Sequence, residues 1–347
     1  MLGPMYCRDI GSWVVKAAGQ YSAVPAGLFR GSMRLLCSGY SIDMSLTHRG
    51  LARSLRCAII GDIIGSLFEG STVRGDYPNS SVTGYPRNSP LVAMALQTGS
   101  PLNVASLDLP VTGSKVTDDS VLSIAVADHL VGSTALTDSL KTWFKAYPNA
   151  GYGAGFTAWT QSTKVSNDSW GNGAAMRVSP IIDLADSLDV ALSLAEQSAQ
   201  PTHNHPEAIE GAQAIALCGY LIKRKASNEE LRTELITRFP AIAQAGFRSL
   251  NEIRPTVEFS VSAKDTVPIA IAVFFESEGL EDLYRKALSM GGDVDTIATM
   301  AGSIAAYRYE IPESLENIID VHLDARMQET LDRFEGYLNS CLPNGDI

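Results

Sequence analysis

The sequence lacks the features that mark several large classes of protein. No uninterrupted apolar run reaches the roughly 18 residues that a membrane-spanning helix needs, so no membrane partner is expected. The five cysteines are scattered without a Cys-x-x-Cys pair, which favours reduced thiols in a cytoplasmic protein over a disulfide framework. Neither a P-loop nor a Gly-x-Ser-x-Gly elbow is present, so kinase and serine hydrolase functions find no support.

Basic residues are scarce in most of the chain. The formal net charge of −11 argues against a nucleic-acid partner, because nucleic-acid-binding domains carry a basic surface. Residues 1–56 are the exception, with seven Lys or Arg and only two Asp. Glycines interrupt this segment, so residues 1–50 are expected to form an irregular basic N-terminal arm. A targeting presequence, a dispensable extension and a partner-binding arm all fit this composition.

The rest of the chain has a mainly helical pattern. Hydrophobic content of 45% with 19% charged residues is typical of a soluble globular protein. Ser227 and Glu230 form a capping box for one helix, and residues 71–114 form a long Gly, Pro and Ser-rich connection of the kind that makes lids or binding loops. No β-rich block appears, so the prediction is a single compact all-α domain over 51–340. Helical spacing of apolar residues predicts helices at 51–60, 118–131, 135–146, 187–199, 206–223, 266–276, 280–290, 294–308 and 323–337.

Two acidic clusters, Thr117-Asp118-Asp119 and Asp293-Val294-Asp295-Thr296, each stand where a predicted helix begins. Asp and Thr are ordinary residues at helix starts, so capping alone is one interpretation. Capping needs one side chain, however, and neighbouring carboxylates repel each other unless a cation neutralises them. If the two helix starts meet, four carboxylates and two hydroxyls form an all-oxygen site suited to Mg²⁺ or Mn²⁺. Gly291-Gly292 before the second cluster would let the backbone approach a ligand closely.

Three further segments carry candidate binding residues. The glycine-rich turn Gly171–Arg177 is able to present backbone N–H groups to a phosphate, although taken alone an ordinary Asn-Gly turn explains it better. Gly151-Tyr152-Gly153 offers either an aromatic face for a ligand or a packed aromatic side chain. His203 and His205 lack the Cys or Glu-x-x-His partners of a familiar zinc site. His205 is expected to cap a helix that begins at Pro206.

The order in which these segments occur resembles a known family. They are Gly61-Asp62-Ile63-Ile64-Gly65 with Glu69, Thr117-Asp118-Asp119-Ser120, Gly151-Tyr152-Gly153, Gly171-Asn172-Gly173-Ala174-Ala175-Met176-Arg177, Thr202-His203 and Gly291-Gly292-Asp293-Val294-Asp295-Thr296. This ordered set resembles the successive motifs of the ADP-ribosylglycohydrolases, which include the dinitrogenase reductase-activating glycohydrolases and the ADP-ribosylarginine hydrolases. The resemblance runs from about residue 56 to Pro312.

The resemblance implies an all-α fold with a centre of two Mg²⁺ or Mn²⁺ ions. It implies that Glu69 lies beside that centre as a mobile acidic gate, that Asp62 supports the first glycine turn, and that Asp119 or Asp295 takes a proton from the attacking water. The metal oxygens would come from Thr117, Asp118, Asp119, Asp293, Asp295 and Thr296. The residues that would hold ADP-ribose are Gly151, Tyr152, Gly153, Asn172, Gly173, Met176 and His203.

The implied function is metal-dependent hydrolysis that removes ADP-ribose from a modified protein side chain, with arginine favoured as the acceptor. A second hypothesis is an immunity protein whose basic arm, residues 1–50, occludes the active site of an ADP-ribosyltransferase toxin. Such an arm suits an acidic cleft. A third is hydrolysis of a small ADP-ribosyl compound or another N-glycoside.

Overall fold

The computed structural model describes residues 50–85, 89–164 and 166–341, together with the backbone of five short strands between residues 6 and 41. The chain divides into two compact units, Met1–Arg49 and Gly50–Ile347. In the first unit, β1 (Tyr6–Cys7), β2 (Ser12–Ala17) and β3 (Gln20–Pro25) form an antiparallel sheet, and β4 (Leu36–Cys37) pairs with β5 (Tyr40–Ser41). The proposed roles of the basic arm concern side chains outside the described residues, so they stay predictions.

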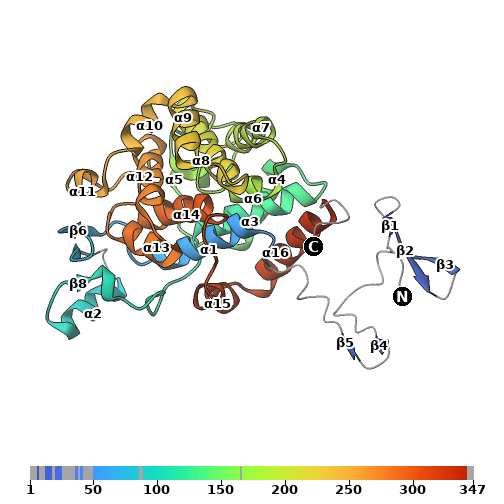
Figure 1. Cartoon of the computed structure of the whole chain (residues 1–347), viewed down its shortest axis with the longest axis horizontal. Coiled ribbons are helices and arrows are strands. Elements are labelled where there is room, and N and C mark those ends of the chain that lie inside the picture. Colours follow the sequence, from blue (N-terminus) through green and yellow to red (C-terminus); the bar gives the residue numbers. More distant parts are fainter. Residues whose placement is uncertain are drawn as a thin grey trace. The chain divides into compact units, whose positions relative to one another are not determined.

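The second unit is built from helices, which confirms the predicted all-α fold (Figure 1). Helices α3, α8, α9 and α14 begin at or next to the predicted residues, and α9 carries the expected Ser227–Glu230 capping box. The helices are α1 (Arg53–Gly65), α2 (Pro90–Thr98), α3 (Asp118–Val131), α4 (Leu136–Ala146), α5 (Ala154–Thr160), α6 (Ser179–Leu184), α7 (Leu188–Ala199), α8 (Pro206–Lys223), α9 (Asn228–Arg238), α10 (Pro240–Gly246), α11 (Leu250–Ile253), α12 (Ala263–Glu276), α13 (Leu280–Leu288), α14 (Val294–Ala305), α15 (Glu313–His322) and α16 (Ala325–Cys341), with short 3₁₀ turns η2 (Val104–Ser106), η3 (Asn172–Ala174) and η4 (Arg254–Thr256).

The 71–114 connection contains three short strands within the otherwise helical unit. Here β6 (Thr72–Arg74), β7 (Ser81–Gly84) and β8 (Leu102–Asn103) form a small antiparallel sheet in the order β6-β7-β8. Val82 of β7 pairs with residues of both neighbours and is fully buried. Strands of two to four residues are too short to show a period of two, so the sequence pattern carries no signal for them.

Helices α1 and α14 form the centre of the second unit and pack directly against each other. Every residue of α14 is buried, and so is every residue of α1 after Arg53. A helix that is apolar nearly all round is stable only when other helices cover it. The covering layer includes α3, α6, α8, α12 and α13. Because these helices surround α1 and α14, the C-terminus of α1 and the N-terminus of α14 are buried inside the unit.

Charged groups from distant helices hold α1 in place. Its N-terminus has no capping side chain of its own, and the Asp183 carboxylate of α6 instead accepts the Ser54 and Leu55 N–H groups at 2.8 and 2.9 Å. Arg56 is buried and donates to the buried Glu335 of α16 at 2.7 and 3.1 Å. Arg56 and its neighbour Arg53, two of the seven basic residues counted in 1–56, therefore belong to the helical unit and not to the arm.

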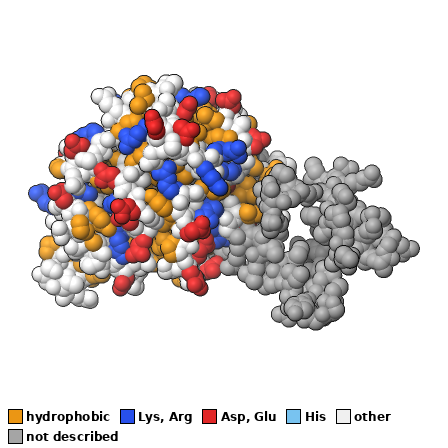
Figure 2. Space-filling model, viewed as in Figure 1, with side chains coloured by type: hydrophobic (Ala, Val, Ile, Leu, Met, Phe, Trp, Pro, Cys, Tyr) orange, Lys and Arg blue, Asp and Glu red, His pale blue; other side chains and the backbone are white. Residues whose placement is uncertain are grey.

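The surface carries charges of both signs. On the face drawn in Figure 2, Lys and Arg side chains alternate with Asp and Glu side chains over the described residues. Among those residues, no helix is long and apolar enough to cross a bilayer. Cys57 and Cys218 are buried free thiols and Cys341 is an exposed one, as expected of reduced cysteines. The side chains of Cys7 and Cys37 lie outside the described part.

Candidate metal centre and active site

The two acidic clusters lie at neighbouring helix starts. Thr117 is the N-cap of α3 and accepts the Asp119 N–H at 3.3 Å, and Asp293 precedes the first residue of α14. Capping is thus part of the role of Thr117. The clusters also meet directly, because the Thr296 hydroxyl donates to Asp119 Oδ2 at 3.2 Å.

Asp62 joins α1 to the first of these helix starts. Its buried carboxylate accepts the N–H and hydroxyl of Thr117 at 3.0 and 2.6 Å, and the N–H and hydroxyl of Ser120. The prediction that Asp62 supports a glycine turn is wrong, because Gly61 and Gly65 belong to helix α1 itself. These glycines let α14 approach: a Cβ added to Gly65 would lie 2.4 Å from the Asp295 Cα atom.

Asp62, Asp119 and Asp295 form a compact group of carboxylates. One oxygen from each lies within 4.8 Å of the others, and all three side chains are buried. Asp119 Oδ1 is buried without a hydrogen-bond partner among the described residues. A buried carboxylate oxygen left unpaired is costly, and an all-oxygen donor set is the kind that Mg²⁺ and Mn²⁺ prefer. The residues present therefore fit a divalent cation.

Burial and mutual repulsion raise the pKa values of the acidic groups. Burial, followed by the charges of Asp62 and Asp293, raises the pKa of Asp118 to about 8. The pKa values of Asp119 and Asp295 are raised well above the usual range, first by burial and then by neighbouring carboxylates. A cation placed among these groups would remove the repulsion and return the carboxylates to their charged form.

The acidic group borders a cavity of about 340 Å³. Twelve of the predicted site residues line it: Glu69, Asp118, Asp119, Gly151, Gly153, Asn172, Gly173, Met176, His203, Asp293, Asp295 and Thr296. The two helix starts, the Gly151 loop and the Gly171 turn thus contribute to one space. Glu69 stands exposed at this cavity. Its mobility stays a prediction.

Thr117 and Tyr152 are the predicted site residues that do not line this cavity. The Thr117 side chain is engaged with Asp62 and lies behind the helix start. The Tyr152 ring stacks on Phe156 with centroids 5.4 Å apart and packs against Phe144 at 4.8 Å. Its packed position matches the alternative of an aromatic side chain in a plain loop, with Phe156 as the aromatic residue that reaches the cavity.

The Asn172 side chain holds one of the acidic side chains, Asp293, in place, a role that the sequence does not indicate. Its side-chain amide donates to Asp293 Oδ2 at 2.7 Å, and its backbone N–H donates to the Val261 carbonyl oxygen at 2.8 Å. Neither group is therefore free for a phosphate in this arrangement. Gly291 and Gly292 have φ of +73° and +75°, and a Cβ on Gly291 would meet the Ser71 carbonyl oxygen at 2.7 Å. The backbone of this glycine pair therefore lies close to other backbone of the protein, where the sequence predicted a close approach to a ligand.

His203 presents one ring nitrogen to the cavity. Arg177 Nη2 donates to Thr202 Oγ1 at 2.8 Å, and Thr202 Oγ1 lies 2.7 Å from His203 Nδ1. A Thr202 hydroxyl that accepts from Arg177 still has one proton to donate and one lone pair to accept with, so the contact fits a proton on either ring nitrogen of His203. Burial, followed by the Arg177 charge, lowers the pKa of His203 to about 3. Its neighbour Gly173 leaves room for the ring, since a Cβ there would lie 2.8 Å from Nε2.

Comparisons with known proteins agree with this site. Residues 47–339 match the sequence model of the family described as ADP-ribosylglycohydrolase. The chain belongs to the ADP-ribosylglycohydrolase family. Members of this family hydrolyse ADP-ribosyl linkages, and the chain is accordingly an enzyme that acts on ADP-ribosylated substrates.

Individual relatives cover much of the chain. It is 26% identical to human ADP-ribosylhydrolase ARH3, across 77% of this chain and 88% of that protein. It is 24% identical to ADP-ribosylarginine hydrolase Tri1 of Pseudomonas putida strain GB-1, across 62% of this chain and 66% of that protein. A solved structure titled "ADP-ribosylglycohydrolase-related protein complex" matches with a TM-score of 0.61 and 21% identity, over 84% of this chain and 97% of that one, which shows a shared fold.

Sequence reasoning gave Asp62 another role in this ADP-ribosylglycohydrolase site and did not place Phe156 or Val261 at it. Asp62 belongs to the carboxylate group, and Phe156 and Val261 line the cavity. A signal existed for Asp62, because a lone Asp among the apolar residues of a buried helix needs polar partners. No local signal marks Val261, which reaches the cavity only because its carbonyl pairs with the Asn172 N–H.

Proposed function

We propose that this ADP-ribosylglycohydrolase removes ADP-ribose from modified arginine side chains and that it needs divalent cations to do so. The observation that supports the proposal most is the buried group of Asp62, Asp119 and Asp295 at the edge of a cavity of about 340 Å³. Arginine as the acceptor is supported by the similarity to Tri1, which is named an ADP-ribosylarginine hydrolase.

The two acidic helix starts would hold two Mg²⁺ or Mn²⁺ ions. The donors facing the cavity are Asp118, Asp119, Asp293, Asp295 and Thr296, with Thr117 behind them. When bound, such ions lower the pKa of water and so make a nucleophile available near neutral pH. Asp62 keeps the start of α3 in position through its bonds to Thr117 and Ser120, and Asn172 does the same for Asp293.

The hydrolysis itself needs a residue that accepts the proton of the attacking water. A water adds its oxygen to the anomeric carbon, the carbon–nitrogen bond to the guanidinium breaks, and the acceptor arginine leaves. Asp119 or Asp295 takes the proton of the water, because both carboxylates line the cavity and would be in their charged form once a cation neutralises the group. Glu69, at the cavity, is a third carboxylate available to the reaction.

The rest of the cavity would bind ADP-ribose. Burial keeps His203 neutral by lowering its pKa to about 3, and with Thr202 donating to Nδ1 its Nε2–H group would donate to a phosphate or ribose oxygen. Gly151, Gly153 and Gly173 leave room for the ligand beside it, and Met176 contributes an apolar contact.

A panel of linkages tests the acceptor. Purified protein would be incubated with polypeptides that carry ADP-ribose on arginine or on serine, and with free ADP-ribosylated small molecules, and released ADP-ribose would be measured. The proposal expects release from the arginine linkage to be at least about tenfold faster than from the serine linkage. Equal or faster release from serine would overturn arginine specificity while leaving the hydrolase function intact.

A second function is supported by the composition of the first unit. Residues 1–49 hold Arg8, Lys16, Arg30, Arg34 and Arg49 against two Asp, a charge suited to an acidic cleft such as the active site of an ADP-ribosyltransferase toxin. Deletion of residues 1–43 separates this role from hydrolysis. Toxin inhibition that disappears while ADP-ribose release persists would support a blocking arm, and unchanged inhibition would exclude it.

A further inference from the structure

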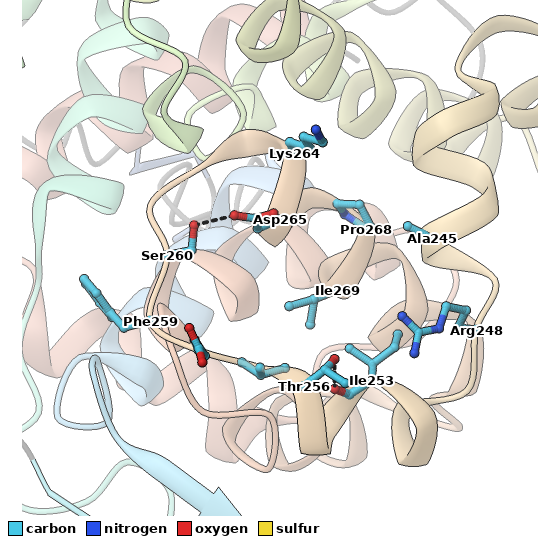
Figure 3. Close-up of a pocket in the computed structure, with 12 residues that line it drawn as sticks. Ala245, Arg248, Ile253, Thr256, Phe259, Ser260, Lys264, Asp265, Pro268 and Ile269 are labelled. Atoms are coloured by element: carbon cyan, nitrogen blue, oxygen red, sulfur yellow. Dashed lines mark hydrogen bonds between the residues drawn. The ribbon is translucent and has the colours of Figure 1, made fainter.

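A second cavity lies beside the active site. It measures about 530 Å³ and is bordered by α10, α12 and the segment Val257–Ser262, called here the 257–262 loop (Figure 3). Ile269 stands near the centre of the view, with Lys264 and Arg248 at separate edges and Phe259 at the outer rim of the loop. The active-site chemistry does not use this cavity.

The 257–262 loop is the wall between the two cavities. Val261 lines the active-site cavity, and its carbonyl accepts the Asn172 N–H at 2.8 Å. The other end of the loop packs on the glycine pair before α14, since a Cβ added to Gly292 would lie 3.2 Å from the Val257 side chain. Val257 also lines the second cavity. One short segment thus contacts Asn172 and Gly292, which position the acidic residues of the site, on one side, and lines the second cavity on the other.

Large apolar side chains are exposed at this wall. Phe259 is 56% exposed, Val261 is 45% exposed and Trp170, whose carbonyl accepts the Ala263 N–H, is 50% exposed. Phe259 also lies beside Gly70, the residue after Glu69, because a Cβ on that glycine would be 4.0 Å from the Phe259 ring. Exposed aromatic and aliphatic side chains gathered at one place are typical of a surface that another molecule covers.

The second cavity has the mixed chemistry of a polypeptide-binding surface. Its floor includes the buried Ile253 and Ile269, and its edges carry exposed charges of both signs, Arg248 and Lys264 with Glu258 and Asp265. An apolar floor with charged edges suits the side chains of a polypeptide.

We propose that the 257–262 loop, with Phe259 at its outer rim, and the cavity behind it form the docking surface for the polypeptide that carries the ADP-ribosyl group. The inference rests on the proposed hydrolase function. The active-site cavity has the size of a pocket for one small ligand, so the chain bearing the modified side chain must lie outside it. Phe259 lies next to Gly70, the residue after the exposed Glu69, so the surface outside the active-site cavity runs from Glu69 to Phe259.

Two substrates with the same scissile bond test the docking surface. One is an ADP-ribosylated arginine polypeptide, and the other is free ADP-ribosylarginine. Phe259→Ala should lower kcat/KM for the polypeptide about tenfold, mainly through KM, and should change kcat/KM for the free amino acid less than about twofold. Lys264→Glu should act in the same direction as a second, independent change at the cavity edge.

A matched control is Leu96→Ala in α2, which shortens a side chain that is 77% exposed and lies outside both cavities. It should leave both substrates unaffected. Equal losses on the two substrates, or no loss on either, in Phe259→Ala and Lys264→Glu would overturn the docking surface while hydrolysis by the unmodified protein still stood. If the unmodified protein hydrolyses neither substrate, the proposed function fails and the docking surface with it.

Discussion

Gly65 of α1 and Asp295 of α14 are in backbone contact, and a Cβ added to Gly65 would lie 2.4 Å from the Asp295 Cα atom. No real Cβ is tolerated at such a distance, so Gly65→Ala must push the two central helices apart. We expect it to lower the free energy of unfolding by about 1–3 kcal/mol and to reduce activity by displacing Asp295. Urea unfolding and ADP-ribose release would measure the two effects.

Gly336→Ala in α16 is the control for this change. A Cβ there meets nothing within 4 Å, and the helix interior favours alanine over glycine by about 0.5–1 kcal/mol. Gly336→Ala should therefore stabilise the protein and keep its activity. A Gly65→Ala protein as stable and active as the unmodified one would show that the α1–α14 contact does not position the site.

The buried ion pair between Arg56 and Glu335 predicts a large loss of stability. Glu335→Ala leaves the Arg56 guanidinium, which is 2% exposed, without its main carboxylate partner. Breaking a buried pair in this way costs about 3–5 kcal/mol. The exposed pair of Arg238 and Glu234 is the comparison, and Glu234→Ala should cost no more than about 0.5 kcal/mol. Similar losses in urea unfolding for the two variants would contradict this account.

The Thr202–His203 contact predicts a defined tautomer. Thr202 Oγ1 accepts from Arg177 and lies 2.7 Å from Nδ1; we expect its own proton to point to Nδ1, which would place the His203 proton on Nε2. Because burial lowers its pKa to about 3, His203 should stay neutral at pH 5. Nitrogen NMR of the ring measures both properties. Thr202→Ser should preserve the tautomer and Thr202→Val should lose it, whereas a His203 that is protonated at pH 6 would refute the assignment.

The raised pKa of Asp118 gives a pH dependence of stability. The folded protein binds this proton up to about pH 8, whereas the unfolded chain releases it near pH 4, so stability conferred by the proton is lost as pH rises between these values. In chelator, the Tm should be lower at pH 8 than at pH 5.5, and Mg²⁺ should raise it most at pH 8. Asp118→Asn should reduce this difference. A Tm that rises from pH 5.5 to 8 in chelator would contradict the crowded-carboxylate explanation.

Local sequence signals located much of this site. The starts of α3 and α14 and the acidic clusters on them were predictable, because a helix cap and the apolar run after it lie within a few residues. His205 likewise caps α8 as expected, with its Nδ1 accepting the Glu207 N–H.

Other features depend on residues far apart in the chain. Asp62 lies beside Asp119 and Asp295 because α1 packs against α3 and α14, and the glycines that permit this packing are typical of a turn in the sequence. Tyr152 and Phe156 both belong to one glycine-rich segment and both pack against Phe144, which is distant enough in the chain that the sequence does not show which of the two rings lines the cavity. The 257–262 loop alternates apolar and polar residues in the way typical of a strand, yet it forms no strand, so its local pattern does not predict its position between the two cavities.

Release of ADP-ribose from an ADP-ribosylarginine polypeptide tests the central claim most directly, with Mg²⁺ or chelator present and with unmodified protein or Asp295→Asn. The account predicts release in Mg²⁺, loss of release in chelator with recovery when Mg²⁺ is restored, and a loss of about 100-fold or more in Asp295→Asn. Circular dichroism would verify that the variant is folded. Undiminished release both in chelator and in Asp295→Asn would contradict a metal-dependent hydrolase built on the α1, α3 and α14 carboxylates.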